Sequence, residues 1–196
     1  MHLNALGLSS SQRVLHIAPE QCIYTHLATL LPRTHYITAD FYPEQYPFAK
    51  GIRKIDLCSL GEWETDFYDF IIHCHVLEHT PCNVAYTLYH LHRMLRETGH
   101  HIFSIPFVGA CYAEDFGPLT SEERQLRFGQ KDHMRRFGAE DCEKHLSCLL
   151  RLPPPDQLYT HFSPEDLLHA NIPLPHKDKY SSHNVFVLRK GDFLLR

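Results

Sequence analysis

The sequence has no apolar run of the roughly 20 residues that a membrane-spanning helix needs. Its first residues lack the basic and apolar segments of a secretory signal peptide. Basic residues are not in excess, because 19 Lys and Arg stand against 23 Asp and Glu, giving a net charge of −4 with neutral histidine. These absences argue against membrane insertion, secretion and a broad phosphate-binding surface. We therefore expect a soluble, cytoplasmic protein with no membrane partner and no nucleic-acid partner; the sequence does not indicate its oligomeric state.

Several compact chemical motifs are also missing. There is no G-x-G-x-x-G, no H-E-x-x-H and no C-x-x-C, which argues against a dinucleotide enzyme, a zinc protease and a paired-cysteine site. The seven cysteines are odd in number and scattered, so we interpret them as free thiols in a reducing compartment. The seventeen histidines raise the question of a metal, but their spacing matches no common ligand set, and we predict no metal site.

The length and the hydrophobic pattern predict one α/β domain. A chain of 196 residues, 43% of them hydrophobic, can bury one substantial core, so we expect a single domain over residues 1–196. Short apolar segments alternate with amphipathic helices, and this alternation predicts a mostly parallel sheet with helices on both faces. A last strand is expected to be antiparallel. The predicted strands are 13–18, 35–41, 52–57, 67–74, 102–107 and 184–188, and the predicted helices 21–31 and 83–96.

The composition of the sequence changes after the fifth predicted strand. Residues 108–138 are rich in Gly, Phe, Arg and acidic side chains but have no clear period, and we interpret them as a lid or substrate-binding insertion. A helix is predicted over 139–150 because acidic residues at its start suit the helix dipole. Ser163 as N-cap and Pro164 at the first helical position predict a further helix.

Polar residues follow the ends of the first four predicted strands. In an open parallel sheet, ligands bind outside these carboxyl ends, near the point where the strand order reverses. Ionised Asp40 can accept both hydroxyls of a ribose, and Asp56 is placed to accept from an adenine amino group. Each acid also has a local alternative, an Asx turn at Asp40 and a bond to a nearby amide at Asp56.

Five segments in order resemble one family. R-V-L-H-I-A-P-E, Y-I-T-A-D, K-I-D-L, Y-D-F-I-I-H-C-H-V-L-E-H and L-H-R-M-L-R-E-T-G-H-H-I-F-S-I-P-F are together similar to class I S-adenosylmethionine-dependent methyltransferases over about residues 13–107. The most specific element is Val76-Leu77-Glu78-His79 after the fourth strand. The resemblance implies a Rossmann-like sheet that binds S-adenosylmethionine. It implies cofactor contacts from the first four strand ends, at Ala18, Pro19, Glu20, Asp40, Phe41, Asp56, Leu57, Cys74 and His75.

The first turn departs from the family pattern. Family members usually place a glycine-rich turn after an acidic first strand, whereas this chain has His16, Ala18, Pro19 and Glu20. Without glycine the backbone cannot approach a cofactor in the same way. We expect Glu20 to compensate by pairing with the α-ammonium group of the cofactor.

The insertion offers candidates for the acceptor end of the site. His133 is predicted to be the general base, with Asp132 orienting its ring. Arg135 and Arg136 are predicted to hold an anionic group of the substrate, because guanidinium matches carboxylate or phosphate with two hydrogen bonds. The alternative is that this charged run is only a solvated face.

The sequence therefore predicts methyl transfer from S-adenosylmethionine to a small-molecule acceptor. One alternative is a non-catalytic cofactor-binding or partner-binding module of the same fold, which the glycine-free first turn favours. A second is a nucleotide-dependent oxidoreductase, which Asp40 alone would suit but the missing G-x-G-x-x-G argues against.

Overall fold

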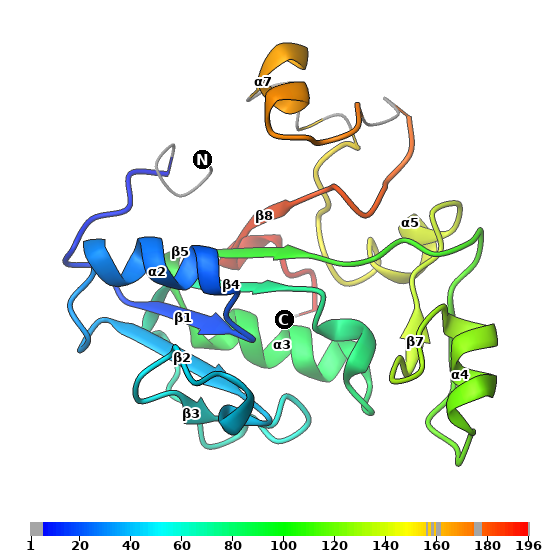
Figure 1. The fold of residues 1–196 in the computed structure, drawn as a ribbon, viewed down its shortest axis with the longest axis horizontal. Coiled ribbons are helices and arrows are strands. Elements are labelled where there is room, and N and C mark those ends of the chain that lie inside the picture. Colours follow the sequence, from blue (N-terminus) through cyan, green and yellow to red (C-terminus); the bar gives the residue numbers. More distant parts are fainter. Residues whose placement is uncertain (1–5, 156, 158, 160–161, 175–177, 196) are drawn as a thin grey trace.

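The structure is a computed structural model that describes residues 6–155, 157, 159, 162–174 and 178–195. One six-stranded sheet organises it, with strand order β3-β2-β1-β4-β5-β8 (Figure 1). The strands are β1 Val14–Ile17, β2 Tyr36–Asp40, β3 Arg53–Lys54, β4 Tyr68–Cys74, β5 Leu95–Ser104 and β8 Phe186–Arg189. All neighbouring pairs are parallel except β5 and β8. The predicted mostly parallel sheet with an antiparallel last strand is confirmed. Among the described residues, no helix is long and apolar enough to span a bilayer.

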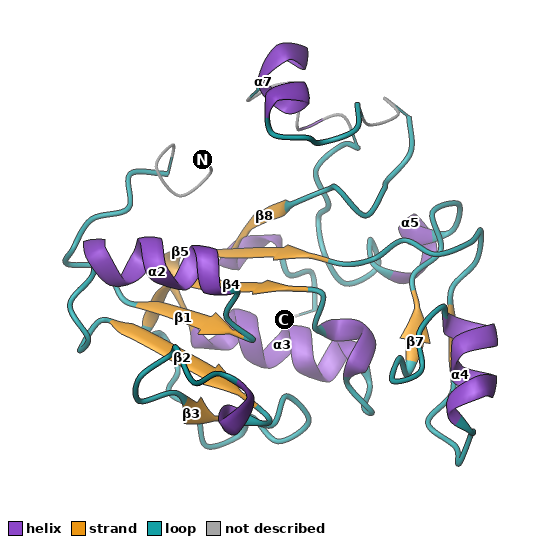
Figure 2. Ribbon diagram, in the orientation of Figure 1, coloured by secondary structure: helices purple, strands orange, loops and turns teal. Residues whose placement is uncertain are grey.

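Helices cover both faces of this sheet, as predicted (Figure 2). Helix α2 (Gln21–Leu30) buries Leu27 in a cluster with Val14 and Phe70. Helix α3 (Val84–Met94) buries Leu91 in a different cluster, with Leu15 and Ile71. Because neighbouring residues of a strand point to opposite faces, these two clusters place α2 and α3 on opposite sides of the sheet.

The junction between α3 and β5 differs from the prediction. The helix ends at Met94 and the strand begins at once, because Leu95 pairs with Tyr68. Gly99 falls in the predicted connection between the helix 83–96 and the strand 102–107, but it lies inside β5, where an added Cβ would meet the Tyr68 carbonyl oxygen at 2.9 Å. A glycine is needed there because the neighbouring strand backbone comes so close. The strand also ends at Ser104, earlier than the predicted 107.

The insertion has its own secondary structure, which the sequence reading did not assign. Strands β6 (Ala113–Glu114) and β7 (Arg135–Arg136) form an antiparallel pair, with helix α4 (Ser121–Phe128) between them in sequence. The insertion lies beyond the carboxyl ends of β4 and β5 (Figure 1). It therefore occupies the edge of the sheet where a ligand of this architecture is expected.

The C-terminal third is partly as predicted. Helix α7 (Pro164–His169) begins with Ser163 as its N-cap, as expected. The helix predicted over 139–150 is wrong in extent, because α5 covers only Cys142–His145. The chain leaves the helix so that Leu150 can form a bridge with Phe193. The remaining turns are the 3-10 helices η1 (Pro43–Gln45), η2 (Leu77–His79) and η3 (Lys190–Asp192).

The prediction that all the cysteines are free thiols is wrong for two of them. Cys58 and Cys82 form a disulfide, with their Cα atoms 5.7 Å apart. The bond joins the loop after β3 to the loop after η2, two segments that are neighbours only in the folded chain. The other five cysteines are free: Cys22, Cys74, Cys111, Cys142 and Cys148.

A chain of buried histidines crosses the core. His73 Nε2 lies 2.8 Å from His101 Nε2, and His101 Nδ1 lies 3.2 Å from His92 Nε2. His92 Nδ1 lies 3.4 Å from the Lys190 carbonyl oxygen. Since a carbonyl only accepts, the protons run in one direction from His73 to Lys190, and each ring is neutral. Burial lowers the pKa of His73 to about 3 and that of His92 to about 4.

Candidate active site

The order of strands reverses between β1 and β4, so the crevice at their carboxyl ends is the expected ligand site. Both strands end in a residue with left-handed backbone, Ala18 at φ 50° and His75 at φ 53°. A side chain in this conformation costs of order 1 kcal/mol. The first turn therefore adopts, with an alanine, a conformation for which glycine is the usual residue. Two strained positions on adjacent strand ends make these strand ends the candidate site.

Glu20 lies in this crevice and is already paired. Its Oε2 is 3.0 Å from His16 Nε2, and the carboxylate stays about one-third exposed. Burial opposes ionisation of Glu20, but the hydrogen bonds from His16, the backbone and Cys74, together with the electrostatic attraction of His16, outweigh it, so the pKa of this carboxyl is lowered. Cys74 lies beside Glu20, and burial and this carboxylate raise the pKa of its thiol to about 12. The structure thus brings Glu20 and Cys74 together and keeps Glu20 anionic.

Asp40 makes the Asx turn that was its local alternative. Its Oδ1 accepts from the Tyr42 backbone N–H at 2.7 Å, and its Oδ2 accepts from the Tyr46 hydroxyl at 3.0 Å. The negative charge of Glu20 also affects Tyr46: burial, Asp40 and Glu20 together raise the pKa of the Tyr46 hydroxyl. Both acids therefore act electrostatically on the same tyrosine hydroxyl. Sequence reasoning missed Tyr46 because it lies in a loop without periodicity, six residues after the acid it contacts.

The residues around Asp56 divide into a polar and a buried set. Asp56 Oδ1 accepts from the Cys58 backbone N–H at 2.8 Å. Leu57 is buried in the core cluster under α3, so its side chain packs inside the domain and not on the crevice. Pro19 is likewise buried. Phe41 is exposed, and its ring lies 5.1 Å from Lys54 Nζ.

The strand end at His75 leads into a second group of polar residues. His75 Nδ1 lies 3.5 Å from Glu78 Oε1, and this hydrogen bond raises the pKa of His75. Glu78 is only 1% exposed, and its neighbour His79 faces it from η2. Glu78 belongs to the motif that carries the family resemblance, but the sequence reading gave it no role.

His133 reaches this group from the insertion. It is 1% exposed, so it does not lie on a solvated face. Its Nδ1 is 3.2 Å from the Phe128 carbonyl oxygen, and its Nε2 has no hydrogen-bond partner among the described residues. Burial lowers the pKa of His133, so the ring is neutral near pH 7. Asp132 does not orient His133; its Oδ2 lies 3.2 Å from His79 Nδ1 instead.

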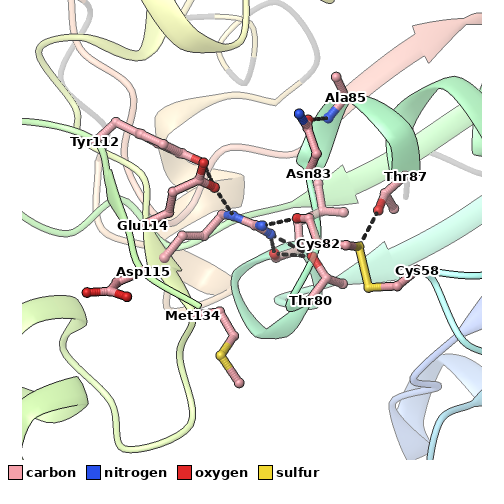
Figure 3. Close-up of polar contacts among 12 residues, drawn as sticks. Cys58, Thr80, Cys82, Asn83, Ala85, Thr87, Tyr112, Glu114, Asp115 and Met134 are labelled. Atoms are coloured by element: carbon pink, nitrogen blue, oxygen red, sulfur yellow. Dashed lines mark hydrogen bonds and ion pairs between the residues drawn. A yellow bond between two sulfur atoms is a disulfide. The ribbon is translucent and has the colours of Figure 1, made fainter. Parts of the chain in front are cut away.

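Arg135 is placed differently from the prediction that it binds substrate. Its side chain is fully buried and donates to the carbonyl oxygens of Leu77 and Cys82 and to Thr80 Oγ1. Its Nε donates to Glu114 at 3.3 Å. Figure 3 shows Glu114 on one side of this network and Thr80 and Cys82 on the other, with the disulfide to Cys58 behind them. The hydrogen bonds of this guanidinium therefore attach the insertion to the loop after β4.

Arg136 is half-buried and is held less firmly. Its Nε donates to the Cys111 carbonyl oxygen at 3.1 Å, and its Nη1 donates to the Arg127 carbonyl oxygen at 3.1 Å. It lines a hollow of about 180 Å³ with Glu114, Asp115 and Arg127. Another hollow, of about 320 Å³, lies near His92 and Lys190 and includes none of the predicted site residues.

Comparison with known proteins bears on the fold. No protein-family model matches the sequence, and no curated protein matches it. A solved N1-methyltransferase of 1,6-didemethyltoxoflavin from Burkholderia thailandensis superposes with a TM-score of 0.55 at 16% identity, over 95% of this chain and 73% of the other. The YcgJ protein of Bacillus subtilis superposes with a TM-score of 0.52 at 16% identity, over 96% of this chain and 92% of the other. The CurJ carbon methyltransferase superposes with a TM-score of 0.53 at 19% identity, over 96% of this chain but only 50% of the CurJ chain.

The fold is that of the class I S-adenosylmethionine-dependent methyltransferases. In this fold Asp40 ends β2, Glu20 follows β1, and Cys74 and His75 lie at the end of β4, so all four are at the carboxyl ends of neighbouring strands. Asp56 follows the edge strand β3 on the same side. Leu57, Pro19 and Arg135 are buried in the protein. His133 lies with Glu78 and His79, at the end of the crevice formed by the insertion.

Proposed function

We propose that this protein transfers a methyl group from S-adenosylmethionine to a small-molecule acceptor. The observation that carries the proposal is the set of strand-end groups around the reversal of strand order: the anionic Glu20 beside β1, Asp40 after β2, and the left-handed turns at Ala18 and His75. A neighbour of the same fold was solved with S-adenosylhomocysteine and a small heterocyclic substrate. The neighbours methylate nitrogen in one case and carbon in another, so the acceptor atom is left open.

The groups present fit this cofactor. A carboxylate has two oxygens with about four acceptor positions, and Asp40 uses one on each oxygen for Tyr42 and Tyr46. The remaining positions can receive the two ribose hydroxyls. Asp56 Oδ1 accepts from the Cys58 backbone N–H, which leaves Oδ2 to accept from an adenine amino group. Glu20 stays anionic and partly exposed, as pairing with an α-ammonium group requires.

When bound, S-adenosylmethionine supplies an electrophilic methyl group on a sulfonium. The chain's own part is to align the acceptor and to keep water away from it. The insertion suits this, because Arg135 holds it directly over the loop after β4. His133 offers a neutral imidazole with an unpaired Nε2, so it remains our candidate to receive a proton from the acceptor. Arg136, at the edge of the same insertion, is the candidate contact for an anionic group of the acceptor.

Calorimetry with S-adenosylhomocysteine tests the cofactor claim. Asp40→Ala should weaken binding by about 1.5 to 3 kcal/mol, because it removes charged hydrogen bonds to the ligand. It should also lower the melting temperature of the empty protein, because Tyr42 and Tyr46 lose their bonds to Asp40, so affinity is compared below the melting temperature of both variants. Glu44→Ala is the matched control, since it removes an exposed carboxylate from the next turn with the same change in charge. Equal affinities for the two variants would remove Asp40 from the site. No binding at millimolar ligand would favour the non-catalytic module instead.

Turnover measurements test the acceptor end. His133→Ala should lower turnover far more than cofactor affinity, because the residue lies away from the adenosine-binding strand ends. His145→Ala is the control, because His145 is an exposed histidine that pairs with Asp141 outside the crevice. Activity of His133→Ala equal to that of the control would take His133 out of the reaction.

A further inference from the structure

Three potential metal ligands meet where the insertion touches the loop after β4. Glu78 and His79 belong to η2, and His133 comes from the insertion. One ligand atom from each residue lies within 4.8 Å of the other two. Glu78 and His133 are each 1% exposed. We propose that Glu78, His79 and His133 bind a divalent transition-metal ion, with zinc as the preferred metal.

Unsatisfied atoms are the first argument for this site. Glu78 Oε2 and His133 Nε2 are buried and have no hydrogen-bond partner among the described residues. Buried polar atoms are nearly always paired, and an unpaired one calls for a specific explanation. A cation between them would satisfy both at once. It would also balance the charge of a carboxylate that is otherwise almost fully removed from water.

The outer contacts of the two histidines are the second argument. A metal-bound histidine usually donates its other ring N–H to a carboxylate or a backbone carbonyl. His79 Nδ1 lies 3.2 Å from Asp132 Oδ2, and His133 Nδ1 lies 3.2 Å from the Phe128 carbonyl oxygen. Both rings are thus oriented through Nδ1, which leaves Nε2 of each as the ligand.

Rigid supports hold the two chain segments together. The Met134 N–H donates to the Glu78 carbonyl oxygen at 2.8 Å, next to His133. Arg135 binds the Leu77 carbonyl oxygen and Thr80 on either side of Glu78 and His79. With metal–ligand bonds of about 2.0 to 2.2 Å, the ligand atoms must close by roughly 1 Å, which small side-chain rotations can supply.

The donor set indicates the class of metal. Two imidazoles and one carboxylate form a set that catalytic zinc sites use, with a water or a substrate in the fourth position. Imidazole nitrogen disfavours magnesium and calcium, which prefer oxygen ligands. His75 lies 3.5 Å from Glu78 Oε1, so the open position would border the cofactor contact predicted at His75. This metal site differs from our sequence-based expectation of none.

Titration of the metal-stripped full-length chain with Zn²⁺ alone tests the proposal without any cofactor. Cys22, Cys111 and Cys148 are exposed thiols, so the titration uses a variant with serine at all three positions. We expect one equivalent bound and a raised melting temperature. Glu78→Gln and His133→Ala should each weaken binding by at least about 100-fold, and Asp132→Asn by about 10-fold. His145→Ala removes a histidine of a comparable histidine–aspartate pair elsewhere, and this variant should bind Zn²⁺ as the parent does.

The outcomes separate cleanly. No binding at millimolar Zn²⁺, or undiminished binding by Glu78→Gln and His133→Ala, overturns the metal site. If a ligand variant fails to fold, X-ray absorption of the zinc-loaded parent decides: two imidazoles and an oxygen support the site, and sulfur ligands overturn it. S-adenosylhomocysteine binding is measured separately, so loss of the metal site leaves the cofactor claim standing. Since His133 Nε2 cannot bind a metal and also accept a proton, a confirmed metal site removes His133 as the candidate base.

Discussion

The sheet, residues 14–104, and the insertion, residues 108–138, are held together by different means. In the sheet, alternating apolar residues bury both faces, as with Leu15 under α3 and Phe70 under α2. In the insertion, Phe137 joins the core cluster of Leu77 and Phe103, and one buried guanidinium adds hydrogen bonds to the loop after β4. The sheet thus packs through apolar side chains on both faces, whereas the insertion adds a buried polar network to its apolar contact. The candidate site lies where the two regions meet.

The largest expected effect is acid destabilisation of the sheet. Burial holds the pKa of His73 and His92 at about 3 and 4, and that of His101 well below its usual range. The unfolded chain therefore binds protons more readily, so stability is full above about pH 6.5 and is lost as the pH falls towards 4. Each histidine contributes of order 1 kcal/mol per pH unit in that window, so the total is several kcal/mol.

Urea unfolding at a series of pH values measures this loss. His101→Phe should flatten the dependence, because it removes the central ring of the chain. His26→Ala, at an exposed position on α2, should leave it as it is. A parent protein equally stable at about pH 4.5 and pH 7 would show that these rings are not neutral core groups.

Next in size is release of the insertion. Arg135→Met leaves the Leu77 and Cys82 carbonyl oxygens without their buried partner, and we expect a loss of about 3 kcal/mol. Arg127→Met breaks only the exposed pair with Asp115, which is worth less than about 1 kcal/mol. Urea unfolding gives the free energies, and limited proteolysis should cut the first variant within 108–138 before the sheet unfolds. Similar losses for both variants would refute the special role of Arg135.

The smallest effect concerns the glycine-free turn. Ala18 has φ 50°, so Ala18→Gly should relieve strain and raise the free energy of unfolding by up to about 1 kcal/mol. Ala85→Gly, inside α3, should lower it by about the same amount. Thermal unfolding compares the two variants. A destabilised Ala18→Gly variant would mean that the alanine methyl group matters more than the backbone strain.

The sequence predicted the sheet well because apolar periodicity decides it. β1, α2, β2 and β4 lie where the pattern placed them, to within a residue or two. Gly99 was misread because its role comes from Tyr68 on the neighbouring strand, and a single sequence does not show that contact. Helix α4 could have been found, since Thr120 and Glu123 form a capping box that is legible in the sequence.

The candidate site was predictable only in part. Acids at strand ends follow from the order of elements, which is why Asp40 and Glu20 were selected. The role of Arg135 was misjudged because charge alone does not reveal burial. Tyr46 was missed because a loop has no hydrophobic periodicity that would place its side chains. Glu78, His79 and His133 form a cluster only through the long-range contact of the insertion with η2. The Cys58–Cys82 disulfide was missed for the same reason.

The most direct test of the whole account is a crystal structure of the protein grown with S-adenosylhomocysteine. We predict that its ribose hydroxyls bind Asp40, that its α-ammonium group meets Glu20, and that its sulfur lies beside His75 on the side of the insertion. If the ligand instead lies elsewhere and Tyr46 still donates to Asp40, the central claim is wrong.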